Sequence, residues 1–243
     1  GVFSANAIAL RSGQSGFVGP MDLNSTVKHV FALGGSHLSR LPMIYHSAVH
    51  RRVINEIISS TGRLFHSKQP DVFVGMAFAA VANSAIHIDL ALTVNAWSLR
   101  SNSGSMRKEY GSKKNLEYIH EFKNKKFHKS LPDDPRMAFF NATPDAILTA
   151  SEKFPSYFCK YTFNYSAMFA IFTRLSFYQN YWWILKNRKT FREISNFSII
   201  TFHGFLFLNL AISLIGKIQG LLHLRHRVES NSPYLWIKNE IDR

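Results

Sequence analysis

The segment FHSKQPDVFVGMAFAAV, residues 65–81, constrains the fold more than any other part of the chain. Its Pro70 and Asp71 precede a run of apolar residues that includes glycine and alanine. Proline and aspartate are both favoured at a helix start, so the segment predicts a helix over residues 71–85. An aspartate there is a favoured N-cap, because its side-chain oxygen accepts a free backbone N–H. The same carboxylate stays ionised beside the helix N-terminus and can take a proton from a hydroxyl, so Asp71 is either a cap alone or also a catalytic base.

The segments around this helix predict alternating helices and strands. Residues 48–60 carry apolar side chains at the spacing of one helix face, and Gly62 ends that helix. Residues 63–67 predict a short strand, and residues 86–96, rich in Ile, Val and Leu, predict a strand or a strand pair. The glycines of residues 1–40 indicate turns and short strands. The order helix, strand, helix, strand predicts α/β layers.

Composition and charge narrow the classes of protein and partner. The chain has 243 residues, of which 46% are hydrophobic and 18% charged, a globular composition rather than a disordered one. Its 29 Lys and Arg against 15 Asp and Glu give a net charge of +14, which suggests nucleic acid, acidic lipid or a phosphorylated substrate as partner. The single cysteine, Cys159, excludes an internal disulfide framework and favours a cytoplasmic location.

Three runs of sequence carry a resemblance to a known family. They are LPMIYHSAVHRRVINEII (41–58), TGRLFHSKQPDVFVGMAFAAVA (61–82) and LTVNAWSLRSNSGS (92–105). Together they resemble the acceptor-side half of family 2 glycosyltransferases with the GT-A fold. The resemblance implies a partial, Rossmann-like α/β core over residues 1–105. It also implies inverting transfer of a sugar from a nucleotide-diphosphate donor to a glycan or lipid-linked acceptor.

The resemblance also implies a role for Asp71 and a missing half. Asp71 matches the family's acceptor-activating base, although Pro70 stands where the family commonly has Glu. The family's donor-binding half holds a divalent metal, Mg or Mn, through an Asp-x-Asp motif that this chain lacks. Asp133 and Asp134, set between prolines, predict an exposed turn instead. The chain is therefore expected to be the C-terminal portion of a longer enzyme, inactive alone.

Two groups of residues are candidates for substrate binding. A polar loop follows the strand at residues 86–96, where hydroxyls, an amide and a guanidinium suit a diphosphate. Its candidates are Trp97, Arg100, Ser101, Asn102 and Ser103. Tyr45 and His46 lie between a proline turn and a helix start, where an acceptor could be contacted. The alternatives are a solvated loop and a packing or capping role, and His46 with His50 lacks the further ligands of a zinc site.

Residues 106–243 predict a basic, aromatic-rich helical extension. Residues 113–129 predict a basic helix, and residues 161–186 predict an aromatic-dense helix that leads into a cluster of Lys and Arg. Aromatic side chains beside cations are typical of an interfacial membrane segment, so an anionic membrane surface, peripheral on the inner face, is favoured over nucleic acid. A non-catalytic, membrane-associated interaction protein is therefore the alternative to the enzyme.

The most apolar long segment is FSIITFHGFLFLNLAISLIGKI, residues 197–218. It has about the 20 residues that a membrane span requires. A helical wheel nevertheless gathers several polar positions on one side. These are Ser198, Asn209, Ser213 and Lys217. The segment therefore predicts a helix that packs in a core or on a partner, lies in a membrane interface, or spans.

Overall fold

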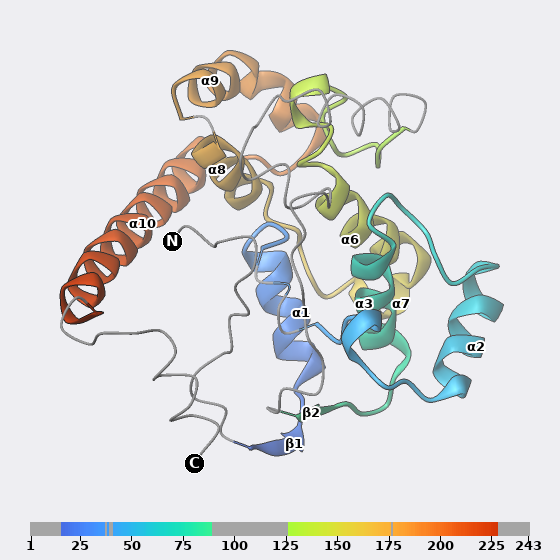
Figure 1. The fold of residues 1–243 in the computed structure, drawn as a ribbon. Helices are drawn as coiled ribbons and strands as arrows, with labels where there is room; N and C mark the ends of the chain where they lie inside the picture. The colour runs from blue at the N-terminus through green and yellow to red at the C-terminus, as the bar shows by residue number, and fades with distance from the viewer. Residues whose placement is uncertain (1–15, 37, 39–40, 89–125, 176, 228–243) are drawn as a thin grey trace.

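The computed structural model describes residues 16–36, 38, 41–88, 126–175 and 177–227. Within these residues the chain is mostly helical (Figure 1). The N-terminal elements are β1 (Val18–Pro20), α1 (Leu23–Ala32), η2 (Ile44–His46), α2 (Arg51–Thr61), α3 (Pro70–Val81) and β2 (Ile86–Ile88). The C-terminal elements are η3 (Pro135–Met137), α6 (Ala142–Lys153), α7 (Pro155–Phe158), α8 (Tyr165–Leu175), α9 (Phe177–Ile194) and α10 (Ile199–Arg227).

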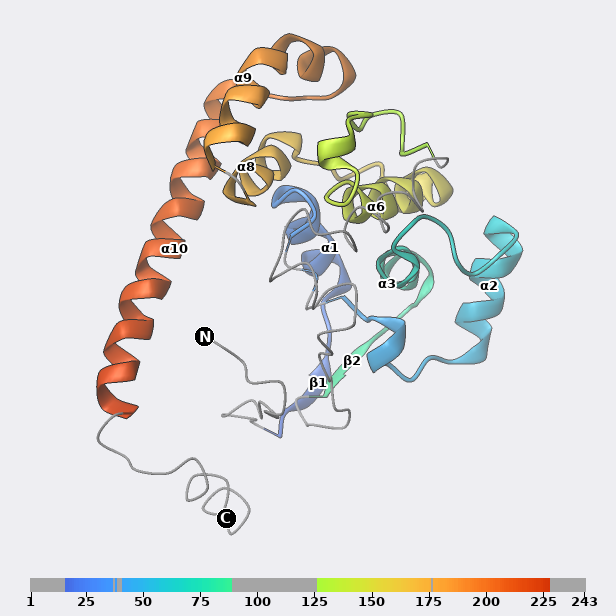
Figure 2. The same cartoon turned by 45° about the horizontal axis from the view of Figure 1, so that its top comes forward.

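Helix α3 lies at the centre of the N-terminal part. Every residue from Val72 to Ala79 is buried, so the helix has no polar face. It packs against α1, α2 and α6, which lie around it in Figures 1 and 2. A helix that is apolar on all sides must be buried all round, and here other helices supply that cover. The predicted helix over residues 71–85 is confirmed, with its start at Pro70 and its end at Val81.

Helix α2 confirms the helix predicted for residues 48–60. It begins at Arg51, where the ring of His50 accepts the backbone N–H of Arg52 at 3.2 Å. It ends at Thr61, and the following Gly62 has a φ of 82°, the left-handed conformation that glycine adopts without strain. Its buried residue Ile57 faces the core, while the opposite side is exposed.

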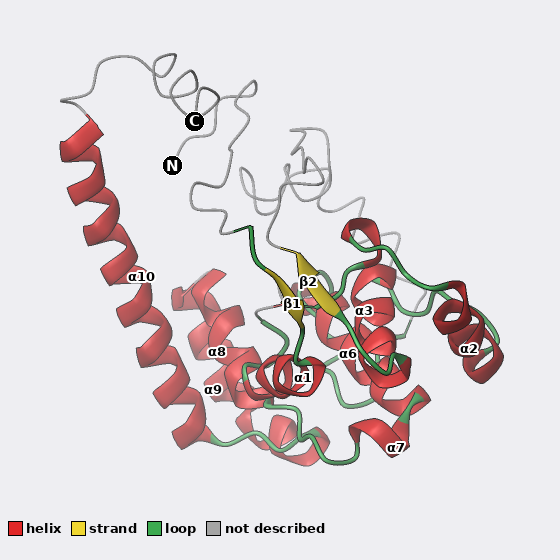
Figure 3. Cartoon of the chain, turned by 90° about the horizontal axis from the view of Figure 1, so that it is seen from below, coloured by secondary structure: helices red, strands yellow, loops and turns green. Residues whose placement is uncertain are grey.

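The predicted α/β core is wrong for the part of the chain that the structure describes. Strands β1 and β2 form one antiparallel pair, with Val18 opposite Ile88, drawn in yellow in Figure 3. A Rossmann-like core has a mostly parallel sheet with helices on both faces. Helices instead cover α3, and the described residues hold no parallel sheet. The partial GT-A fold is therefore not the architecture of these residues.

Local backbone geometry explains where the strand predictions failed. Residues 63–67 form a loop, because Gly62 turns the chain and Ser67 also has a positive φ of 63°. Residues 1–40 include helix α1, whose start is fixed by Asp22 accepting the N–H of Ser25 at 2.9 Å. That cap is readable in the sequence, but the surrounding glycines pointed to turns.

The C-terminal part is helical, as predicted, although its helices divide differently. The predicted aromatic helix over residues 161–186 is two helices, α8 and α9. Phe169 of α8 stacks on Phe191 of α9 at 4.4 Å between ring centroids. Helix α10 then runs along α8, and Figure 2 shows its far end extending away from the other helices. The basic helix predicted over residues 113–129 lies almost wholly outside the described residues.

Candidate functional site

Asp71, the predicted catalytic base, lies in the first turn of α3 and is partly exposed. The predicted N-cap role is wrong, because Gln69 occupies the N-cap position and Pro70 precedes Asp71 inside the helix. The Gln69 side chain makes no cap and instead accepts the hydroxyl of Thr143 on α6. A carboxylate in the first turn still interacts favourably with the helix dipole. The catalytic role of Asp71 stays a prediction.

The predicted acceptor residues Tyr45 and His46 lie in η2, which packs against α3. Tyr45 is 67% exposed, and His46 is also exposed. Met43, just before η2, approaches the middle of α3 near Gly75. The structure thus brings η2 and α3 together. The other predicted contacts, Trp97 and residues 100–103, lie outside the described residues.

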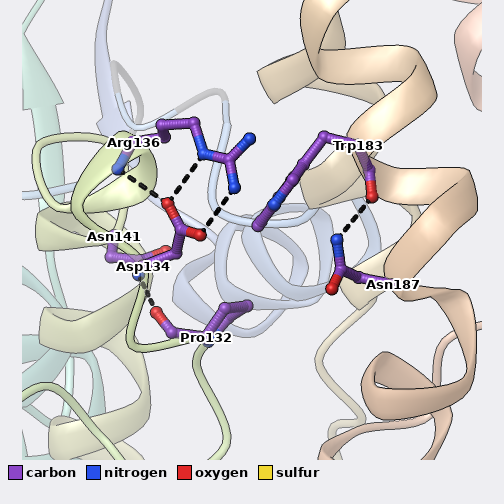
Figure 4. Close-up of polar contacts among 6 residues, drawn as sticks. All are labelled: Pro132, Asp134, Arg136, Asn141, Trp183 and Asn187. Atoms are coloured by element: carbon purple, nitrogen blue, oxygen red, sulfur yellow. Dashed lines mark hydrogen bonds and ion pairs between the residues drawn. The ribbon is translucent and has the colours of Figure 1, made fainter.

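Asp134 belongs to a self-contained ion pair that joins the η3 turn to α9 (Figure 4). Arg136 donates its Nε to Oδ1 at 3.0 Å and its Nη2 to Oδ2 at 2.9 Å. Burial raises the pKa of Asp134, but the hydrogen bonds and charge of Arg136 outweigh it and hold that pKa below its ordinary value. The same guanidinium lies 4.6 Å from the ring of Trp183 on α9. The cluster therefore fixes the turn against α9.

This pairing does not fit the divalent metal that the glycosyltransferase resemblance implies. Both carboxylate oxygens of Asp134 are occupied by Arg136, while Asp133 is exposed. Hard cations need several free oxygen ligands, which this turn does not offer. Among the described residues, no group of three or more His, Cys, Asp or Glu is placed to hold a metal ion.

A shallow groove between α6, α7 and the segment after α9 is lined by the titratable residues His128, Glu152 and Tyr165, among others. His128 Nε2 lies 2.9 Å from Glu152 Oε1, and its Nδ1 accepts the N–H of Ser130 at 3.2 Å. Asp145, buried beneath, accepts the N–H of His128 at 2.8 Å, and burial raises its pKa. Burial likewise raises the pKa of Tyr165, and it outweighs a hydrogen bond with Ser130 that acts in the opposite direction. Glu152 and Ser130 occupy the two ring nitrogens of His128, so the ring holds the segment around His128 against α6.

Helix α10 presents an unusual distribution of apolar side chains. Its buried residues Phe202 and Leu206 face the protein. Seven large apolar side chains between Ile200 and Ile215 are at least 42% exposed. We call them the α10 apolar surface: Ile200, Phe207, Leu208, Leu210, Ile212, Leu214 and Ile215. A soluble surface helix normally turns such residues toward the core, so this surface has the composition of an interaction site.

Two polar positions at the start and in the middle of α10 contact α8 instead. The backbone N–H of Ser198, just before the helix, donates to Ser166 of α8 at 2.8 Å. The Oδ1 of Asn209 accepts Nη1 of Arg174, also on α8, at 3.2 Å. Asn209, from the predicted polar side, therefore lies toward α8, and the α10 apolar surface lies outward. Sequence periodicity detected both sides but could not say which one faced the core.

Helix α9 adds exposed aromatic residues beside α10. Phe177, Tyr178 and Trp182 are 47%, 76% and 56% exposed. Tyr181 connects them to α10, because its hydroxyl lies 3.1 Å from Nε2 of His203 and its ring stacks on Phe177. The aromatic side chains and the α10 apolar surface therefore meet around His203.

One finding bears directly on the three alternatives for residues 197–218. In the part of the chain that the structure describes, no helix is both long and apolar enough to cross a membrane.

No family model, curated protein or solved structure matches the chain.

Proposed function

We propose that this chain docks on the surface of a membrane, with α10 lying in the interface. The α10 apolar surface carries the proposal. Ile200, Phe207 and Leu214 follow at intervals of seven residues, close to two helical turns, so they line one side. Each is more than half exposed. No Asp, Glu, Lys or Arg occurs between Ile199 and Ile215, so nothing charged must be desolvated when this side enters the acyl region.

The inward polar positions support an interfacial orientation. Interfacial helices bury an apolar face in the boundary between headgroups and acyl chains and keep polar groups away from it. The backbone N–H of Ser198, just before α10, and the Oδ1 of Asn209 bond to α8, and the Nδ2 of Asn209 donates to the backbone oxygen of Phe205. The outward side can therefore enter lipid without leaving a polar side chain of that stripe unpaired. The free thiol of Cys159 and the anionic lipid of cytoplasmic leaflets favour the inner membrane face.

A second copy of the chain is the main competing occupant. Two such apolar surfaces could bury one another, as in a helix pair. The lipid surface is preferred because exposed Trp182 and Tyr178 lie beside α10, and amphipathic aromatic rings gather at membrane interfaces. The glycosyltransferase activity stays a prediction from the resemblance, without the GT-A fold as support.

Vesicle binding by a triple variant tests the docking. I200S/F207S/L214S should bind lipid vesicles at least about 100-fold more weakly than the wild type, since each lost side chain removes on the order of 1 kcal/mol or more of apolar burial. These side chains are exposed, so the variant should keep its helical circular dichroism. The measurement is vesicle co-sedimentation across a lipid titration.

A matched variant and one further measurement separate lipid from the alternatives. I58S/F65S/I86S removes three exposed apolar residues from α2, the following loop and β2, and should bind as the wild type does. Equal weakening by the two triple variants would contradict a specific role for α10. The docking would also be contradicted if the wild type did not bind vesicles and instead dimerised through Ile200, Phe207 and Leu214 in sedimentation equilibrium.

A further inference from the structure

We infer that the membrane recognised is anionic, and that lysines on the exposed face of α9 bind the phosphates of its headgroups. This inference rests on the proposed docking of α10 and adds the chemistry of the lipid. The residues concerned are Tyr178, Trp182, Lys186 and Lys189. All are exposed, and they follow one another at spacings of three and four residues, so they form one row on a single helix face. We call them the α9 row.

The orientation of α9 is fixed by its buried side. Ile184 and Phe191 are buried, and Phe191 stacks on Phe169 of α8. The Trp183 ring, next in sequence to Trp182, packs on Phe172 and Phe191 instead. These contacts hold one side of α9 against the core. The packing of the helix therefore fixes the exposure of the α9 row to solvent.

The cations of α9 lack carboxylate partners in the described residues. The ion pairs recorded there involve His128, Lys129 and Arg136, none of which belongs to α9. Helix α9 contains more basic than acidic residues, with Glu193 as its acidic one. Its basic residues are Lys186, Arg188, Lys189 and Arg192. Unpaired ammonium groups on a rigid helix retain their full attraction for an anionic surface.

The contacts between α9 and α10 bring this row near the start of the α10 apolar surface. Tyr181 touches both Phe202 and His203 of α10, so the exposed side of α9 lies alongside the first turns of the apolar surface. Figure 2 shows α9 lying against the starting end of α10. If α10 lies in the acyl boundary, the Trp182 and Tyr178 rings meet the interfacial layer. The lysines, one and two turns further along α9, then meet the phosphates.

Nucleic acid would also attract these lysines, but the neighbouring surface does not suit it. Nucleic-acid interfaces are polar and strongly cationic, whereas the α10 apolar surface is uncharged and apolar. A lipid bilayer matches both neighbouring chemistries, because its phosphates lie directly above an apolar layer. The charge and the apolar area thus point to the same partner.

The test compares vesicles of phosphatidylcholine with vesicles that also contain phosphatidylglycerol. The wild type should bind the anionic vesicles at least about tenfold more tightly, and this preference should shrink as salt rises from about 0.05 M to about 0.5 M. K186Q/K189Q should lose about tenfold or more on anionic vesicles, because each basic residue near the surface contributes about fivefold. It should bind neutral vesicles unchanged, and K186R/K189R should restore the preference.

The control removes the same charge elsewhere. K28Q/K153Q takes two exposed lysines from α1 and α6 and should keep the wild-type preference. Equal wild-type binding to both vesicles, or equal losses in the two glutamine variants, would overturn the headgroup inference and leave the docking of α10 intact. Absence of binding to either vesicle would overturn the docking as well. Lysine-dependent binding to duplex DNA without vesicle binding would identify the surface as a nucleic-acid site and overturn both.

Discussion

His66 illustrates how a single buried ring holds the loop between α2 and α3. It is 7% exposed and lies 4.7 Å from the ring of Phe73 on α3. Arg63 makes two polar contacts with the ring, donating Nε to Nδ1 at 3.4 Å and accepting from Nε2 through its backbone oxygen at 3.1 Å. Burial, followed by the charges of Arg63 and Lys153, lowers the pKa of His66 below its ordinary value of 6.5. The folded protein therefore favours the neutral ring.

This lowered pKa predicts a pH dependence of stability. The unfolded chain binds a proton near pH 6.5 more readily than the folded chain does, so the free energy of unfolding should fall as pH drops through and below that value. His66→Phe keeps an aromatic ring against Phe73 and removes the titration. Urea unfolding at about pH 7.5 and about pH 5.5 should therefore show a smaller loss of stability in the variant than in the wild type.

A second variant isolates the electrostatic contribution at the same ring. Arg63→Gln removes a cation that lowers the pKa of His66, so its loss of stability between the two pH values should be intermediate. The same pH dependence in the wild type and His66→Phe would show that other groups cause the acid sensitivity.

Two glycines in different elements predict opposite effects of the same substitution. Gly34 follows α1 with a φ of 61°, and an added Cβ would lie 2.3 Å from the backbone nitrogen of Met168 on α8. Gly34→Ala should cost at least about 2 kcal/mol, because it combines left-handed strain with a backbone clash. Gly75 lies inside α3, where an added Cβ would meet its nearest atoms at an ordinary 3.5 Å. Gly75→Ala should stabilise the protein by about 0.5–1 kcal/mol.

Urea unfolding curves of both variants check this pair, provided that their m-values match the wild type. The sequence predicts a turn near Gly34 and a helix around Gly75, but it does not show what lies against either glycine. The structure distinguishes them by the positive φ of Gly34 and by the approach of α8 to the end of α1. A destabilised Gly75→Ala together with a tolerated Gly34→Ala would contradict the packing of α1, α3 and α8 described above.

The elements that sequence predicted correctly are those specified by local chemistry. Helix α2 has a one-sided apolar pattern and a terminating Gly62, and α3 begins with Pro70 and continues as an apolar run. The fold class failed because an apolar helix such as α3 is equally compatible with a sheet or with helices around it. That choice depends on contacts between α3 and distant α6, which no local pattern contains.

The candidate site shows the same division between pattern and orientation. The aromatic and basic residues of α9 and the polar stripe of α10 were visible as composition and periodicity. The sequence did not show which side of α10 stays exposed, because that depends on the contact between Asn209 and Arg174 of α8. Periodicity defines two sides of a helix, whereas tertiary contacts decide which side remains exposed. The function proposed here depends on that orientation.

Across the whole molecule, one hydrophobic cluster connects both ends of the described chain. It includes Val27 of α1, Phe73 of α3, Ile147 of α6, Phe169 of α8 and Phe202 of α10. A continuous core favours cooperative unfolding, because no part can open without exposing residues shared with the rest. The side chains of the α10 apolar surface, in contrast, are exposed, so core and surface substitutions should separate stability from binding.

Phe202 and Phe207 offer that separation with one residue type on one helix. Phe202 is fully buried against Phe197 and Tyr181, so Phe202→Ala should leave a cavity and cost about 3–5 kcal/mol. Phe207 is 76% exposed, so Phe207→Ala should change stability by less than about 0.5 kcal/mol. Its loss should instead weaken vesicle binding by roughly tenfold, because the ring provides apolar area to the lipid interface.

Thermal unfolding and vesicle co-sedimentation of the two variants check the separation. In Phe202→Ala, far-ultraviolet and near-ultraviolet circular dichroism should report one transition that moves to lower temperature, since the core unfolds as a unit. Phe207→Ala should unfold as the wild type does. If Phe207→Ala were as destabilising as Phe202→Ala, the outer side of α10 would be part of the core. The α10 apolar surface would then be unavailable to a membrane, because its side chains would already be buried within the protein.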